Sequence, residues 1–181
     1  MNESQEKTLA LATLYERHSG LTRAISDVLY EAASICLSRH HTSPVDMQIE
    51  CDTRSTQRAT EFAVPDFRTR NAWANNIDAT ENGAYGLSLA AIEVERGLTA
   101  VRRAETLTGA DWYVGRDGTK AADLEQCLRL EVSGVDGGKR SVLKARLKQK
   151  VEQTKRGASN IPAIASVVGF RERTIMIQTV Q

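Results

Sequence analysis

The feature that most constrains the fold is a helix-length segment that is apolar nearly all round. Residues 81–96, ENGAYGLSLAAIEVER, place apolar or small side chains on almost every side of a helical wheel. Such a helix is stable only where other layers of structure cover it. Thr80 is the expected N-cap, and Gly97 is expected to end the helix. The chain must therefore supply layers on both sides of this helix.

After this helix the pattern of apolar residues changes from helical to strand-like and back again. Three short apolar runs separated by turn residues predict strands, a basic amphipathic segment predicts a helix, and two more apolar runs predict further strands. The predicted elements are strands at 98–105, 110–115 and 127–134, a helix at 140–156, and strands at 160–170 and 173–180. This alternation predicts an α/β fold with a mixed central sheet.

The part of the chain before residue 80 is predicted to be a helical and irregular extension. Residues 3–18 and 21–38 have the spacing of amphipathic helices, and residues 45–52 alternate as a half-buried strand does. Residues 53–80 are polar and irregular. Their large apolar side chains are expected to fold back onto the core, and these are Phe62, Val64, Phe67 and Trp73.

Length and composition indicate one compact domain, with residues 1–79 as the extension and residues 80–181 as the core. No apolar run approaches the roughly 20 residues that cross a bilayer, and the N-terminus lacks the layout of a secretory signal. Three scattered cysteines, Cys36, Cys51 and Cys127, are typical of reduced thiols in a protein core. These features predict a cytoplasmic protein with no membrane partner.

Charge is distributed unevenly along the chain, although the formal net charge is only +1. Residues 139–156 contain eight basic residues and one acid, whereas the chain before them carries a net charge of −7. A concentrated basic segment is typical of a surface that contacts a polyanion such as nucleic acid. The alternative is an ordinary solvated helix face. The predicted nucleic-acid contacts are Lys139, Arg140, Lys144 and Lys148.

Two of the predicted strands each carry a carboxylate, Asp111 in GADWYVG and Glu131 in LRLEVSG. An ionised carboxylate in a buried strand is costly unless a cation, a proton or hydrogen-bond donors compensate it. If the two strands are neighbours, one divalent cation can neutralise both groups, and Mg²⁺ is typically held by one or two carboxylates with waters and phosphates. The structural alternative is that one carboxylate accepts backbone N–H groups while the other pairs with an arginine.

The order α-β-β-β-α-β, with Asp111 on the second strand and Glu131 near the end of the third, resembles the PD-(D/E)XK nuclease superfamily over residues 80–170. The resemblance implies a restriction-endonuclease-like fold and hydrolysis of phosphodiester bonds in nucleic acid, with DNA as the expected substrate. It also implies Mg²⁺ or Mn²⁺ held by Asp111 and Glu131. Glu93 corresponds to an extra acidic ligand found in some members, with a capping or solvent-facing role as the alternative.

One position departs from that family's pattern, because the lysine of its E-x-K motif falls at Ser133. A serine hydroxyl cannot supply the positive charge that orients water and stabilises the phosphate. A lysine on the following helix replaces it in some members, and Lys150 borders the apolar stripe of that helix, as Lys144 does. The resemblance thus implies the catalytic residues Asp111, Glu131, Lys150 and Ser133.

The alternative is a protein that has lost catalysis and keeps the fold as a module for binding nucleic acid or for protein assembly. In that case the two N-terminal helices are the expected partner surface. They are also the expected contact in a homodimer or a larger assembly.

Overall fold

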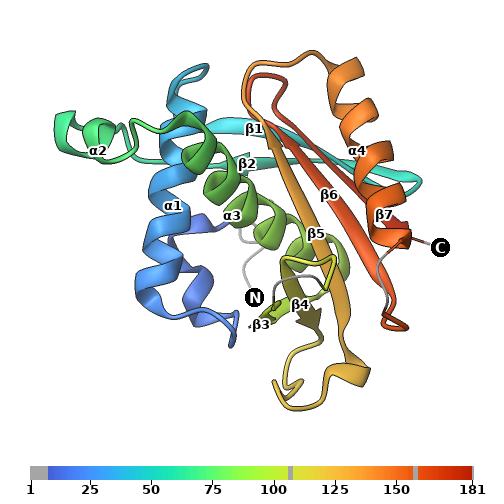
Figure 1. The fold of residues 1–181 in the computed structure, drawn as a ribbon. Helices are drawn as coiled ribbons and strands as arrows, with labels where there is room; N and C mark the ends of the chain where they lie inside the picture. The colour runs from blue at the N-terminus through green and yellow to red at the C-terminus, as the bar shows by residue number, and fades with distance from the viewer. Residues whose placement is uncertain (1–7, 106–107, 157–158, 181) are drawn as a thin grey trace.

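The computed structural model describes residues 8–105, 108–156 and 159–180. A seven-stranded mixed sheet forms its centre, with helices on both faces (Figure 1). The prediction of an α/β fold with a mixed sheet is therefore confirmed.

Within the described residues, the N-terminal part of the chain contains helices and two strands, and the C-terminal part contains five strands with the helix α4 (Arg140–Lys155) between them. In order the elements are η2 (Leu11–Glu16, a 3-10 helix), α1 (Arg23–Ser38), β1 (Val45–Cys51), β2 (Arg54–Thr60), α2 (Phe67–Ala72), α3 (Asn76–Arg96), β3 (Thr99–Arg103), β4 (Trp112–Gly115), η3 (Leu124–Gln126), β5 (Leu128–Val135), α4 (Arg140–Lys155), β6 (Ala163–Gly169) and β7 (Thr174–Val180).

Across the sheet the strands lie in the order β2-β1-β7-β6-β5-β4-β3. The pairs β5–β6 and β1–β7 are parallel, and the other neighbours are antiparallel. The helix α4 connects the parallel strands β5 and β6. Because β1 and β2 continue the sheet beyond β7, the N-terminal part is more than the helical and irregular extension that the sequence predicted.

The helix α3 is buried between the sheet and α1, which lies on its outer side (Figure 1). Its buried residues run from Gly83 to Ile92 without a break. A Cβ atom at Gly83 would lie 3.1 Å from the backbone of Ala32 and Ala33, so the small residue lets the two helices approach closely. The apolar segment is thus covered on both sides, as the sequence predicted.

The helix α4 covers the opposite face of the sheet (Figure 1). Its residue Leu143 is fully buried against Val167 of β6 and Met176 of β7, and Leu147 packs at the edge of this cluster. The apolar stripe predicted for the basic helix therefore does face the sheet. Side chains of β5 that point to this face, Glu131 among them, lie under α4 rather than under α3.

Several boundaries in the N-terminal part differ from those predicted. The helix α3 begins at Asn76 rather than after Thr80, because the side chain of Asn75 accepts the N–H of Ile77 and caps it there. The strand β2 and the helix α2 lie in the segment 53–80 that was predicted to be irregular. Most residues of these two elements are exposed or only partly buried. Their sequences therefore lack the apolar periodicity by which a buried element is recognised.

The apolar side chains of this segment divide into two pairs. Phe62 is buried and Trp73 packs against the core, as expected. Val64 and Phe67 are 79% and 80% exposed, so for these two the prediction was wrong.

Of the first predicted helix, residues 3–7 lie outside the described residues. Cys36, Cys51 and Cys127 are buried and free, as predicted. Within the described ranges no helix is both long and apolar enough to cross a membrane.

The close approach of α3 to β5 predicts the effect of adding one methyl group at Gly134. A Cβ atom there would lie 2.5 Å from the carbonyl oxygen of Thr80, so Gly134→Ala must push α3 away from the strand. We expect thermal denaturation to show a loss of about 1–3 kcal/mol in the free energy of unfolding, the usual range for overpacking. Gly137→Ala is the matched control, because a Cβ atom at Gly137 meets nothing within 4 Å. Equal melting temperatures for the two variants would contradict this packing.

Candidate functional site

The edge of β5 is open along its second half, because the strand beside it ends early. The four-residue strand β4 pairs only with Leu128–Leu130 of the eight-residue β5, and no described strand lies beside Val132 on that side. A cleft of about 540 Å³ occupies this edge, between the first half of α3, the end of β5, and α4. Its polar and charged lining includes Glu81, Tyr85, Asp111, Ser133, Arg146 and Lys150.

Asp111 stands at the point where β4 begins, level with Glu131 on β5. Its backbone N–H donates to the carbonyl of Leu130 at 2.8 Å. Its carboxylate Oδ2 accepts the backbone N–H of Val132 at 2.8 Å, in place of the strand partner that is missing there. The other oxygen, Oδ1, accepts a hydrogen bond from the Tyr85 hydroxyl at 2.8 Å. The carboxylate of Asp111 is thus fixed at the mouth of the open edge.

Glu131 is buried beside Asp111, with only 8% of its side chain exposed. Its Oε1 atom lies 2.6 Å from the Nζ atom of Lys150 on α4. Burial and the negative charge of Asp111 raise the pKa of Glu131, whereas the hydrogen bond and the positive charge of Lys150 lower it. The net effect is a raised pKa. The site therefore contains two carboxylates that repel each other and one ammonium group that partly compensates them.

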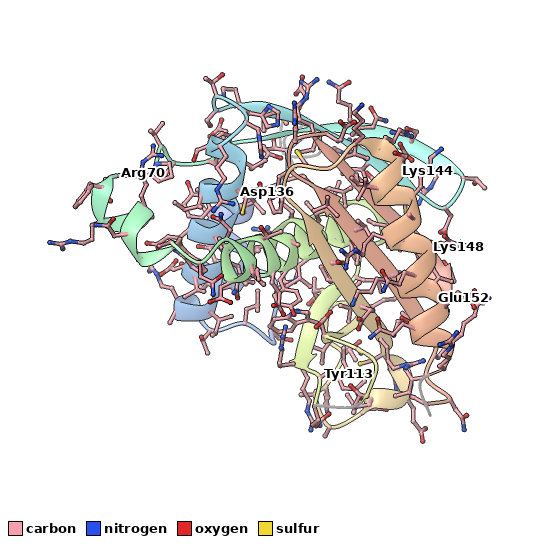
Figure 2. The ribbon with its side chains drawn as sticks, turned by 45° about the horizontal axis from the view of Figure 1, so that its top comes forward. Arg70, Tyr113, Asp136, Lys144, Lys148 and Glu152 are labelled. Atoms are coloured by element: carbon pink, nitrogen blue, oxygen red, sulfur yellow. The ribbon has the colours of Figure 1, made fainter. Side chains whose placement is uncertain are left out.

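Three of the predicted catalytic residues, Asp111, Ser133 and Lys150, line this cleft, and Glu131 lies beside them in contact with Lys150. Lys150 points back from α4 to the sheet, and Ser133 lies two residues after Glu131 on the same side of β5. The cation that Ser133 cannot provide is therefore present at the site, supplied by the next helix. Of the two lysines that the sequence offered for this position, the structure brings Lys150 to Glu131 and leaves Lys144 on the outer side of α4 (Figure 2).

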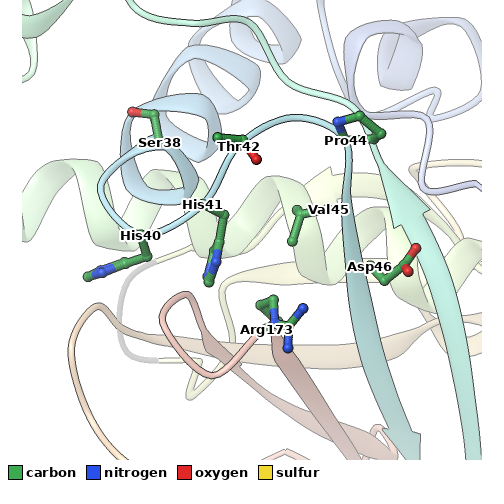
Figure 3. Close-up of a pocket in the computed structure, with 8 residues that line it drawn as sticks. All are labelled: Ser38, His40, His41, Thr42, Pro44, Val45, Asp46 and Arg173. Carbon is green, nitrogen blue, oxygen red and sulfur yellow. The ribbon is translucent and has the colours of Figure 1, made fainter.

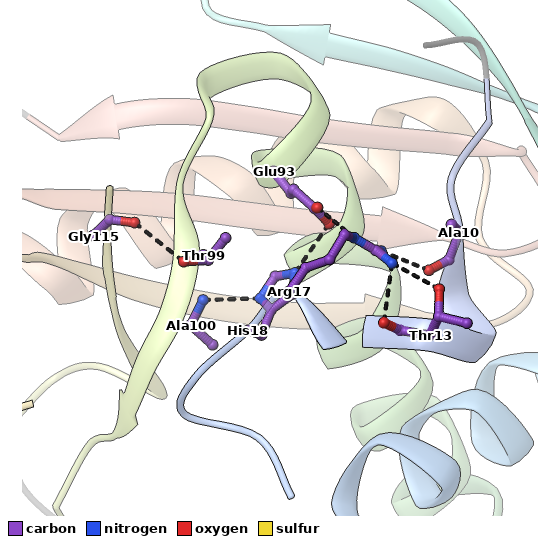
Figure 4. Close-up of polar contacts among 8 residues, drawn as sticks. All are labelled: Ala10, Thr13, Arg17, His18, Glu93, Thr99, Ala100 and Gly115. Carbon is purple, nitrogen blue, oxygen red and sulfur yellow. Dashed lines mark hydrogen bonds and ion pairs between the residues drawn. The ribbon is translucent and has the colours of Figure 1, made fainter. Parts of the chain in front are cut away.

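Glu93 does not join this group, although the sequence suggested it as an extra metal ligand. Its carboxylate pairs with Arg17 and with the Nε2 atom of His18 at 3.1 Å (Figure 4). Since His18 Nδ1 accepts the N–H of Ala100, its Nε2 atom carries the proton that is donated to Glu93. Burial works to raise the pKa of Glu93, but the hydrogen bonds from His18 and Arg17 outweigh it and lower the pKa. The role of Glu93 in the structure is to tie the N-terminal segment to α3.

The acidic residue of α3 that does reach the cleft is Glu81. The hydroxyl of Tyr85 lies 2.6 Å from Glu81 Oε1 and 2.8 Å from Asp111 Oδ1. One hydroxyl proton can serve only one of these carboxylates at a time, and burial together with the two acids raises the pKa of Tyr85. The sequence signal for this contact was the spacing of four residues between Glu81 and Tyr85, which places both on one side of a helix.

The basic residues of α4 fall into two rows. Lys144 and Lys148 lie on its outer side, away from the sheet (Figure 2), whereas Arg146 and Lys150 line the cleft. Arg146 was not among the predicted nucleic-acid contacts. Lys139 and Arg140 lie where the helix begins.

Arg140 forms an ion pair with Glu50 of β1. This contact ties the start of the helix to the sheet. Within the described residues, Arg140 is the one of the four predicted nucleic-acid contacts that forms an ion pair.

A separate open hollow of about 600 Å³ lies where α1 ends and β1 begins (Figure 3). His40 and His41 line it together with the exposed Arg173. The Nε2 atom of His40 is 3.0 Å from Asp136 Oδ1, and the Nε2–H of His41 donates to the carbonyl of Phe170 at 2.8 Å. These bonds hold the end of α1 to the loops at the top of the sheet.

The Lys150–Glu131 contact predicts a stability difference that depends on pH. In Lys150→Ala the buried Glu131 loses its counter-charge, so its pKa should rise further above the value in the unfolded chain. At pH values above the raised pKa, where Glu131 is ionised, the free energy of unfolding should fall by up to about 3 kcal/mol, the scale for breaking a buried ion pair. This loss of stability should shrink as the pH drops through the raised pKa of Glu131. It should vanish below the pKa that Glu131 has in the unfolded chain, because a protonated carboxyl needs no counter-charge.

Thermal denaturation at pH 7 and pH 4 measures this difference. Lys144→Ala is the matched control, since it removes the same charge from the outer side of α4. An equal loss at both pH values in Lys150→Ala would contradict the ionic contact.

In the described part of the chain, no group of three or more His, Cys, Asp or Glu side chains is arranged to hold a metal ion. The cleft is lined by the carboxylates of Glu81, Asp111 and Asp136 and by the cations of Arg146 and Lys150. Comparison with protein-family models, curated proteins and solved structures gives no match to this chain.

Proposed function

We propose that the chain is a metal-dependent nuclease that hydrolyses phosphodiester bonds, with DNA as its substrate. The observation that carries this proposal is the meeting of Asp111, Glu131 and Lys150 at one open sheet edge, with Lys150 Nζ 2.6 Å from Glu131 Oε1. Lys150 is distant in sequence from both acids and is brought to them only by the packing of α4 on the sheet. Two carboxylates and an ammonium group are the groups that phosphoryl chemistry with a divalent cation requires.

The order of elements supports a related proposal about the fold. From α3 to β6 the chain runs helix, three strands, helix, strand, which is the order on which the resemblance to the PD-(D/E)XK superfamily rests. We therefore propose a restriction-endonuclease-like core over this part, with β7, β1 and β2 extending its sheet.

The donor set of the cleft fits Mg²⁺ or Mn²⁺. Hard divalent cations of this size take one or two carboxylates and complete their shell with waters and phosphate oxygens, so two acids suffice. Burial and, to a smaller extent, the negative charge of Asp111 raise the pKa of Glu131 despite the hydrogen bond from Lys150. When bound, such an ion would lower the pKa of a coordinated water and stabilise charge on the phosphate.

The remaining groups of the cleft have separate tasks in this proposal. The ammonium of Lys150 stabilises the negative charge that develops on the phosphate oxygens. Arg146, one helical turn before it, holds the phosphate backbone through charge-assisted hydrogen bonds. Tyr85 fixes the orientation of the Asp111 carboxylate. Ser133 can donate or accept a hydrogen bond at the cleft but carries no charge.

A second candidate function has its own observation in its favour. Lys150 pairs with Glu131, and both oxygens of Asp111 accept hydrogen bonds, so each acid has a partner within the protein. A site satisfied in this way suits a nuclease-like module that binds nucleic acid without cutting it. In that case the N-terminal helices remain the predicted assembly surface.

The nuclease proposal predicts different roles for the acids and for the lysine. Asp111→Asn and Glu131→Gln should each abolish the binding of Mn²⁺ measured by calorimetry. Lys150→Ala should retain Mn²⁺ binding but lower the cleavage rate of labelled DNA on the order of 10²–10³-fold, the effect of removing one group that stabilises transition-state charge. Rates are compared well below the melting temperature of each variant.

Glu152→Gln is the control for this series, because Glu152 lies on the outer side of α4 (Figure 2). Full metal affinity in both acid variants would refute the proposed site. If the natural protein cuts no nucleic acid with Mg²⁺ or Mn²⁺ and Ser133→Lys gains that activity, the non-catalytic module is the correct function.

The basic helix predicts how DNA binding depends on salt. If the helix neutralises about five phosphates, log K against log salt should fall with a slope of roughly −4 to −5 for duplex DNA, at about 0.9 per contact. Lys144→Ala with Lys148→Ala should flatten that slope by nearly two. The control is Arg68→Ala with Arg70→Ala on α2, which removes the same charge far from α4 (Figure 2). Equal slopes for the two double variants would show that α4 is only a solvated surface.

A further inference from the structure

A second, smaller cleft adjoins the candidate site and shares one wall with it. This cleft, of about 330 Å³, lies between α1, α3 and the start of β4, and Tyr85 lines both spaces. Its other walls include Ile25 and Val28 of α1, Arg103 of β3, and Trp112 of β4. A ligand group in this cleft would therefore lie directly beside the one held at Asp111.

Arg103 connects the two clefts. Its guanidinium carbon is 4.4 Å from the centre of the Tyr85 ring and 4.9 Å from that of Trp112, so both aromatic rings support it. Its Nη2 atom donates to the Tyr85 hydroxyl at 3.2 Å and is 3.9 Å from Asp111 Oδ1. Half of the side chain, 49%, remains exposed. Arg103 is thus a supported planar cation with room for a further group against it.

Apolar and aromatic side chains line this cleft. Ile25 and Val28 are 44% and 39% exposed at its rim, and Tyr85 and Trp112 lie beside Arg103. A flat group with apolar faces would cover these side chains and stack on the guanidinium.

We propose that this cleft receives an unpaired nucleobase of the nucleotide next to the phosphate that Arg146 and Lys150 hold beside Asp111. The inference rests on the proposed function, because that phosphate fixes where the base must lie. Unpaired bases are commonly recognised by stacking on arginine guanidinium groups and aromatic rings. A base that is stacked and paired within a duplex cannot enter such a cleft, so the substrate strand must be single at this point, as in a flap or a frayed end.

The size of the cleft favours a base over a protein surface. A volume of about 330 Å³ lies at the lower end of the range of small-molecule pockets, about 300–1,000 Å³. A stable contact between two protein chains needs roughly 800 Å² from each partner. The positive charge of Arg103 also suits a ligand that is attached to a phosphate backbone.

The test is an abasic scan of a single-stranded DNA 12-mer. Binding is measured by fluorescence anisotropy in EDTA, so that cleavage does not interfere, with one base removed at each position in turn. We expect one position at which loss of the base weakens binding about 5- to 150-fold, the range for stacking of one base. Arg103→Met should remove this dependence on position. Val28→Asp, which puts a charge at the rim, should do the same.

Arg102→Met is the matched control. Arg102 precedes Arg103 on β3, is exposed, and pairs with Glu105, so its loss removes the same charge without touching the cleft. This variant should keep the dependence on the missing base. If it loses the dependence as fully as Arg103→Met does, the effect is one of charge and the inference is overturned.

The outcomes separate this inference from the proposed function. Cleavage that needs Mg²⁺, without any position at which the missing base matters, would overturn the base cleft and leave the nuclease standing. A position effect that depends on Arg103, in a protein that never cuts, would support the cleft and refute the nuclease. Self-association that Val28→Asp disrupts, with no position effect, would assign the cleft to contact between copies of the chain and overturn the inference.

Discussion

The burial of α3 between the sheet and α1 is the constraint on which the other features of this protein depend. A helix that is apolar on nearly every side has to be covered by two layers, and the small Gly83 lets α1 approach closely enough to form one of them. The first half of the same helix then lies along the open edge of β5. There the hydroxyl of Tyr85 contacts both Glu81 and Asp111. The packing of an apolar helix thus places polar groups at the cleft.

The electrostatics of the cleft argue that Glu131 is there for a reason other than stability. A buried ion pair is weak evidence for stabilisation, because apolar residues of similar size often fold as well or better. Glu131 nevertheless sits under α4 with a raised pKa and with Asp111 as a like-charged neighbour. A protein that needed only a filled core could place an apolar residue at this position. The costly pair is understandable if a cation or a phosphate completes it, and it is this cost that supports the proposed function.

The sequence predicted the buried elements well, because their apolar periodicity reports directly on the layers that cover them. The strand that Asp111 directly precedes, the strand that holds Glu131 and the helix that carries Lys150 are all within a few residues of their predicted bounds. The prediction of elements from the sequence failed where apolar periodicity is absent, as in the strand β2 and the short helix α2. The resemblance to the PD-(D/E)XK superfamily pointed to Glu93 as the extra acid on α3, whereas Glu81 is the one at the cleft, because the sequence of one helix cannot tell which of its ends meets the open edge. That choice depends on where β4 stops, which is a tertiary feature.

Tyr85 lines both clefts and connects them through its contacts. Its single hydroxyl proton lies between Glu81 and Asp111, while its ring and its oxygen both contact Arg103. A group stacked on Arg103 would contact the same guanidinium group that lies 3.9 Å from the carboxylate of Asp111. Any shift of Arg103 would therefore change the field at the carboxylate and the hydrogen bond that orients it. If a base occupies the smaller cleft, its recognition and the orientation of Asp111 at the phosphate site are connected through Arg103 and Tyr85.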